Sequence, residues 1–195
     1  MERRTLKMQD AKVRERDGGR YLEGYFAVFD REYRVYGDWV ETIAPGAFGA
    51  HLATGADVKI LWNHNHDIVL GSTAAKTAAL REDNIGLFGS VLINEQDQDA
   101  INAYARVSRG DVDGCSIGFD IVRQEESWEN ETYRTRLLEI KLYEGSPCTF
   151  PAYADTSINA RAKDAFDSVK ARFEHAQAEK RNQWRADMLA RLKGE

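Results

Sequence analysis

The 195-residue chain has few cysteines, no net positive charge and no long apolar stretch, and each absence argues against a class of protein. Its two cysteines, Cys115 and Cys148, do not suit a disulfide framework, so we expect a reducing, intracellular setting. A net charge of −5 argues against nucleic acid and anionic membranes as partners. No apolar run approaches the roughly 20 residues that span a bilayer, and the charged N-terminus lacks the apolar core of a signal peptide.

Most of the chain is patterned as short strands. Aromatic, β-branched and alternating apolar residues predict strands at 21–29, 38–43, 57–62, 115–123 and 132–143, with a strand pair inside 70–93 and an edge strand inside 1–16. Helical spacing predicts short helices at 47–52 and 96–109. We therefore expect an α+β fold with a mainly antiparallel, β-barrel-like core and short flanking helices.

The composition changes at about Ala160, where proline is absent and apolar residues follow helical spacing between charges. This pattern predicts an amphipathic C-terminal helix, interrupted near Lys180. We accordingly expect two parts, a body at 1–158 and a helical tail at 159–195.

Three short segments, far apart in the sequence, carry the best candidates for catalysis. Gly114-Cys115-Ser116-Ile117-Gly118 places a thiol and a hydroxyl between glycines, where another backbone can approach closely. Leu61-Trp62-Asn63-His64 supplies a candidate base, and Glu144 follows in a third segment. Serine, histidine and carboxylate are the groups of a serine hydrolase. Glu139 and Asp67 compete with Glu144 for the third position.

The residues alone do not decide whether Cys115 or Ser116 is the nucleophile. Cys115 and Ser116 are neighbours on a predicted strand, so only one of them can face a cleft. An activated thiol is the better nucleophile, whereas a cysteine on the buried face of a strand is usually a small core residue.

A metal site is a further alternative, because His64 and His66 are two residues apart and point the same way on an extended backbone. Asp67 and His51 would be the additional ligands. With four histidines and two cysteines in the whole chain, a complete set of zinc ligands is hard to assemble. A metal-dependent hydrolase therefore ranks last among our hypotheses.

Taken in order between residues 20 and 160, these segments resemble the prohead maturation proteases of HK97-type phages, a family similar in fold to herpesvirus assemblins. The resemblance rests on Glu23-Gly24-Tyr25 with Val28-Phe29, Ala44-Pro45-Gly46-Ala47-Phe48, Leu61-Trp62-Asn63-His64 with Leu70-Gly71, Ser116-Ile117-Gly118-Phe119, and Glu144-Gly145-Ser146-Pro147 with Phe150-Pro151-Ala152. Each segment is generic by itself, whereas all of them in this order are specific.

The resemblance implies a serine endopeptidase with Ser116 as nucleophile, His64 as catalytic histidine and Glu144 as third member. Herpesvirus relatives use a second histidine in the third position, for which His51 and His66 are the local candidates. The resemblance implies no cofactor. Its implied substrates are the scaffold region of the major capsid protein, or a separate scaffold protein, and the protease itself, inside the assembling procapsid in the host cytoplasm. It is also compatible with a homo-oligomer.

A hypothesis from another class is a non-enzymatic capsid-assembly or scaffold protein that acts through its helical tail. Residues 161–195 carry nine Lys or Arg and six Asp or Glu, so the tail is net positive while the rest of the chain is acidic. If the tail binds a helical scaffold, its expected anchors are Phe166, Phe173, Trp184 and Met188. The plainer alternative is a helix docked on the body.

Overall fold

The computed structural model describes residues 2–7, 9–16, 18–149 and 156–193, which form eleven strands and three helices. In chain order these are β1 (Glu2–Lys7), β2 (Gln9–Arg16), β3 (Gly19–Val28), β4 (Tyr33–Tyr36), β5 (Trp39–Ile43), α1 (Gly49–Ala53), β6 (Lys59–Trp62), β7 (Asn65–Ser72), β8 (Ala78–Glu82), β9 (Gly86–Leu92), α2 (Gln98–Arg109), β10 (Gly114–Glu129), β11 (Thr132–Cys148) and α3 (Thr156–Lys193). The protein is thus mixed α and β, mostly strand, with a C-terminal helix.

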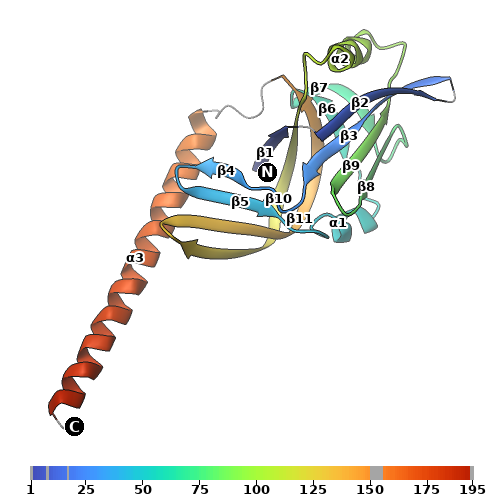
Figure 1. The fold of residues 1–195 in the computed structure, drawn as a ribbon. Helices are drawn as coiled ribbons and strands as arrows, with labels where there is room; N and C mark the ends of the chain where they lie inside the picture. Colours follow the sequence, from blue (N-terminus) through green and yellow to red (C-terminus); the bar gives the residue numbers. More distant parts are fainter. Residues whose placement is uncertain (1, 8, 17, 150–155, 194–195) are drawn as a thin grey trace.

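The long hairpin of β10 and β11 forms the centre of the larger sheet (Figure 1). It belongs to a seven-stranded sheet in which β1 lines the free side of β10 and β5 and β4 continue beyond β11. The second edge of β11 has two partners, because β5 pairs with its first part and β6 with its last part, both in parallel. Strand β7 then pairs with β6, so the sheet divides into two branches.

The expected barrel is wrong, because the strands form two separate sheets that are not closed. Strands β2, β3, β9 and β8 make a second, four-stranded antiparallel sheet. Among the described residues, no hydrogen-bonded strand pair connects this sheet to the first. Closure needs a continuous ladder around the barrel. In the part of the chain that the structure describes, no such ladder joins the two sheets, and side-chain packing holds them together instead.

Phe26 packs closely against β11 of the other sheet. Its ring is fully buried and comes from β3, in the centre of the four-stranded sheet. A Cβ atom on Gly145 of β11 would lie 2.6 Å from this ring, and one on Gly89 of β9 would lie 2.5 Å from it. Both positions therefore require glycine for space, and the ring lies directly behind the strand that carries Glu144.

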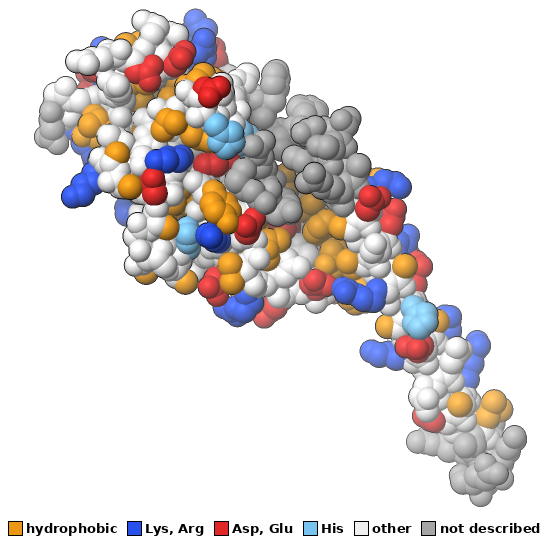
Figure 2. All heavy atoms as spheres, turned by 180° about the vertical axis from the view of Figure 1, so that it is seen from behind, with side chains coloured by type: hydrophobic (Ala, Val, Ile, Leu, Met, Phe, Trp, Pro, Cys, Tyr) orange, Lys and Arg blue, Asp and Glu red, His pale blue; other side chains and the backbone are white. Residues whose placement is uncertain are grey.

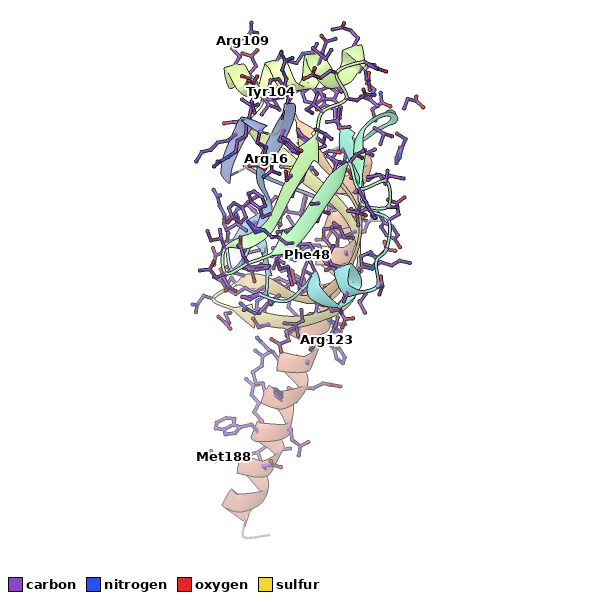
Figure 3. All side chains as sticks on the ribbon, turned by 90° about the vertical axis from the view of Figure 1, so that its right-hand side faces the viewer. Arg16, Phe48, Tyr104, Arg109, Arg123 and Met188 are labelled. Atoms are coloured by element: carbon purple, nitrogen blue, oxygen red, sulfur yellow. The ribbon has the colours of Figure 1, made fainter. Side chains whose placement is uncertain are left out.

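The predicted helices at 47–52 and 96–109 are confirmed as α1 and α2, within a few residues at their ends. Asp97 caps α2 by accepting a hydrogen bond from the backbone N–H of Asp99, and Gly110 ends it with a φ of 83°. Figure 3 shows Tyr104 and Arg109 on this helix at one end of the body, and Phe48, beside α1, within the body. Strands β4 and β7 were not predicted, and the single edge strand expected inside 1–16 is two strands, β1 and β2, which belong to different sheets.

The C-terminal segment is a single helix, so the predicted interruption near Lys180 is wrong. Its first half docks on the far end of the hairpin, where Phe166 and Phe173 lie 5.8 Å and 5.7 Å from the ring of Trp128, centroid to centroid. Its second half projects away from the sheets, with Met188 far from the body (Figure 3). The apolar side chains of the first half of α3 are therefore covered by the body, whereas Trp184, Met188 and Leu189 of the second half are exposed. The division at 158 and 159 stays a prediction.

None of the helices in the described residues is long and apolar enough to cross a membrane.

Candidate active site

His64 lies in the two-residue turn that joins β6 to β7, where Trp62 and Asn65 face each other. Asn63 and His64 have φ values of 52° and 59°, which are left-handed conformations. Two such residues in succession are typical of a type I′ hairpin turn, and the second position normally favours glycine. A histidine held there is under backbone strain, which is a frequent property of functional sites. The turn also means that His64 and His66 do not share an extended strand, as the metal alternative assumed.

The side chain and backbone of Asn63 fasten this turn to the end of β11. The Asn63 N–H donates to the Pro147 carbonyl at 3.1 Å. The Asn63 side chain accepts from the Thr149 N–H at 2.9 Å and donates to the Thr149 hydroxyl at 3.3 Å. These three contacts hold the turn against the strand that carries Glu144.

The His64 ring is paired with Glu144. Its Nδ1 lies 2.7 Å from Glu144 Oε1, and only 18% of the histidine side chain and 4% of the glutamate side chain are exposed. A carboxylate can only accept, so the proton of a neutral ring lies on Nδ1. This tautomer leaves Nε2 with a lone pair that can accept a proton from a nucleophile.

Ser146 is a further member of the group that the sequence reasoning did not single out. Its hydroxyl donates to Glu144 Oε2 at 2.6 Å and accepts from the His64 backbone N–H at 3.2 Å. The side chain is fully buried. The signal was present in the sequence, because residues two apart on a strand lie on the same face.

The β10–β11 ladder places Ser116 on the face of the sheet that carries Glu144 and Ser146. Ser116 is directly opposite Ser146, and Gly118 is opposite Glu144. Directly opposed side chains of an antiparallel pair lie on one face, with Cβ atoms about 5 Å apart. Ser116 is fully buried, between β11 on one side and β1 on the other.

Cys115 lies on the other face of β10 and is part of the hydrophobic core. Burial is the main cause that raises the pKa of its thiol well above the usual range. Cys148 is also buried, and burial together with the charge of Glu144 raises the pKa of its thiol to about 12. Both thiols are therefore held in the protonated, weakly nucleophilic form.

The competing candidates lie apart from this group. His51 is on α1, where its Nε2 contacts the Leu142 carbonyl at 2.8 Å. His66 and Asp67 are exposed at the start of β7. Glu139 is 38% exposed and lies 3.9 Å from the Arg123 guanidinium. Within the part of the chain that the structure describes, no three His, Cys, Asp or Glu side chains are placed to hold a metal ion.

Comparison with protein families identifies the chain. The model of the Caudovirus prohead serine proteases matches residues 9–172, which include Ser116, His64 and Glu144. The chain belongs to this family. It is a serine protease, and the family resemblance noted from the sequence is confirmed.

Among solved structures, this prohead protease is similar to the capsid assembly protease of bacteriophage T4. The match has a sequence identity of 14% and a TM-score of 0.43, and it covers 76% of this chain and 99% of the T4 chain. A comparison with curated proteins gave no match.

Proposed function

We propose that this protease matures a phage procapsid by cutting the scaffold region of the major capsid protein, or a separate scaffold protein, and itself. Family membership supports a capsid maturation protease.

The observation that carries the mechanism is the 2.7 Å contact between His64 Nδ1 and Glu144 Oε1, on the face of the ladder that Ser116 shares. In the proposed reaction His64 Nε2 takes the Ser116 hydroxyl proton as Oγ bonds to the scissile carbonyl carbon. The C–N bond then breaks, and the imidazolium gives its proton to the leaving amine. In the second half of the reaction, His64 Nε2 takes a proton from water as the water oxygen bonds to the acyl carbon. The ester C–O bond then breaks, and the imidazolium gives its proton to Ser116 Oγ.

The role proposed for Glu144 is to hold the ring in this tautomer and to stabilise the transient imidazolium. Its anionic oxygen lies against the ring nitrogen that does not react. A second histidine in this role, as in herpesvirus relatives, would need His51 or His66 beside His64, and both lie elsewhere.

The test is to express the protease with its neighbouring capsid protein and to map the new termini of both chains by mass spectrometry. We expect Ser116→Ala to abolish cutting of both chains and Cys115→Ala to retain it. Cys115→Ala is the matched control, because it removes the neighbouring nucleophile without burying a new polar group. Cutting by Ser116→Ala at the wild-type rate would overturn the proposal.

A thiol reagent separates the two nucleophiles independently. Burial raises the pKa of the Cys115 thiol well above its usual range and, with the charge of Glu144, the pKa of the Cys148 thiol to about 12, so both thiols stay protonated at pH 8. We therefore expect iodoacetamide at pH 8 to leave the folded protease active, whereas the unfolded chain should be alkylated at both cysteines. Rapid inactivation with alkylation of Cys115 would point to a cysteine protease instead.

We further propose that the projecting half of α3 binds an acidic, helical scaffold segment and so brings the protease into the procapsid. Three large apolar residues are exposed there, with exposed fractions of 61% for Trp184, 40% for Met188 and 57% for Leu189. Figure 2 shows exposed hydrophobic side chains towards the far end of this helix, among basic ones. Phe166 and Phe173, which we also expected as anchors, contact the body instead.

A further inference from the structure

Ser146 lies between His64 and Glu144 and is directly opposite Ser116 in the β10–β11 ladder. Its hydroxyl is fully buried and has one partner on each side, the Glu144 carboxylate at 2.6 Å and the His64 backbone N–H at 3.2 Å. We propose that Ser146 is a positioning residue, which locks the Glu144 carboxylate and the His64 turn in the relative orientation that proton transfer requires. This role rests on the function proposed above.

The geometry distinguishes Ser146 from a second nucleophile. A nucleophilic hydroxyl donates to a ring nitrogen of the base, whereas the Ser146 hydroxyl donates to the carboxylate. The ring nitrogen on this side of His64, Nδ1, is already paired with the same carboxylate. Ser116 and Ser146 therefore have different places in one site, although they face each other across the ladder.

Ser146 restrains both partners of the hydrogen bond between His64 and Glu144. Glu144 Oε1 accepts from the ring and Oε2 accepts from Ser146, so the plane of the carboxylate is fixed at both ends. The backbone of His64 has the strained φ of 59°, and its N–H is the group that Ser146 accepts. Without this hydroxyl, a carboxylate oxygen and an N–H would both lose their hydrogen-bond partner in a largely buried place, which is unfavourable for each of them. The ring would then no longer be confined to one tautomer and one orientation.

The first test measures the tautomer directly, in protein that carries Ser116→Ala so that it cannot cut itself. With ¹⁵N-labelled histidine at about pH 8, the His64 ring should show a protonated Nδ1 and an unprotonated Nε2. Adding Ser146→Ala should move both nitrogen shifts towards the average of the two tautomers. Adding Ser146→Thr, which keeps the hydroxyl, should restore them.

The second test measures the rate of cutting of the capsid protein. We expect Ser146→Ala to lower the turnover rate about 10- to 100-fold, as for a small displacement of a catalytic group, while KM changes little. Ser90→Ala is the matched control, because Ser90 donates to the buried Glu23 at 2.8 Å in the other sheet. It should reduce stability in the same way and leave turnover and the His64 shifts unchanged.

Two outcomes would overturn the positioning role. If Ser146→Ala has the turnover and His64 shifts of the wild type, the hydroxyl restrains nothing that matters to the reaction. If it is as inactive as Ser116→Ala while its His64 shifts are unchanged, Ser146 takes part directly. Either result leaves the proposed function intact as long as the wild-type protein cuts and Ser116→Ala does not.

Discussion

The Glu144 carboxylate is almost fully buried, and burial of an unpaired charge would cost several kcal/mol. The protein avoids this cost by giving each oxygen a donor, the His64 ring on one side and the Ser146 hydroxyl on the other. Hydrogen bonds to a charged acceptor are also the stronger ones. The buried charge of Glu144 therefore depends on both donors, the His64 ring and the Ser146 hydroxyl, for its stabilisation.

Glu144→Gln tests this arrangement at the scale of one residue. An amide presents N–H donors on one side, so it cannot accept from both the ring and the hydroxyl. The His64 ring is then expected in the wrong tautomer or a different orientation. By analogy with removal of the orienting carboxylate in other triads, we expect turnover to fall by about three to four orders of magnitude. The measurement is the rate at which capsid protein is cut.

The matched control is Glu139→Gln on the same strand, which is partly exposed and faces Arg123. Exposed ion pairs contribute about 1 kcal/mol at most, so this variant should cut almost normally. Equal loss of activity in the two variants would contradict the role given to Glu144.

The identity of the candidate site residues could be proposed from the sequence, whereas their local geometry could not. The order of the segments pointed to Ser116, His64 and Glu144, which the fold brings to one region. The left-handed backbone of His64 could not be predicted, because His64 has a side chain at a turn position that usually favours glycine. The contact between Ser146 and the His64 N–H joins residues 82 positions apart and depends on how the turn is docked.

At the scale of elements, the position of Glu144 depends on how closely the four-stranded sheet lies behind β11. Gly145 is the residue between Glu144 and Ser146, and its Cα faces the ring of Phe26. The strand alternates at this point between the core on one side and the site on the other. A displacement of the strand at Gly145 is therefore expected to displace Glu144 and Ser146 as well.

Gly145→Ala makes this dependence measurable. The added methyl group would lie 2.6 Å from a ring carbon of Phe26, so the ring or the strand must move. Overpacking of this kind costs about 1–3 kcal/mol, and we expect both a lower free energy of unfolding and slower cutting. Chemical denaturation and the processing rate are the measurements.

In the double variant Gly145→Ala with Phe26→Leu, the smaller leucine side chain makes room for the alanine methyl group. This variant should therefore recover part of the activity. Recovery of stability without recovery of cutting would mean that the strand position and the site are independent.

The strands that were missed lack the pattern on which sequence prediction depends. Strand β7 begins with Asn65, His66 and Asp67, which are exposed and show no apolar alternation. Strand β4 has only four residues. The outer part of β10 is polar from Arg123 to Ser127, and its pairing with β11 rather than its own composition keeps it extended. The division of the sheet at β11 comes from long-range parallel pairing, which no local pattern predicts.

At the scale of the whole molecule, the two halves of α3 have different surroundings. The first half contributes Phe166 and Phe173 to an aromatic cluster with Trp128 and Tyr133. The Arg172 guanidinium adds an ion pair with Glu126 at 2.8 Å. The second half makes no such contact with the body among the described residues, and a helix without tertiary packing is only marginally stable in water. The first half therefore docks on the body, whereas the second half projects from it with its apolar side chains exposed.

Trp184→Ala with Met188→Ala tests the proposed partner surface in the full-length chain. Because both side chains are exposed, the two substitutions should change the free energy of unfolding by only about 0.5 kcal/mol each. Cutting of added capsid protein should stay normal, whereas incorporation of the protease into procapsids should fall sharply. The measurement is the amount of protease in purified procapsids, in the Ser116→Ala background so that self-cutting does not remove it.

Phe173→Ala is the control for the docked half. It removes a ring that contacts Trp128 and Tyr133. Because each aromatic pair is worth about 1 kcal/mol, this variant should lower the melting temperature. Normal incorporation of the Trp184 and Met188 variant would show that the projecting half of α3 has no part in assembly.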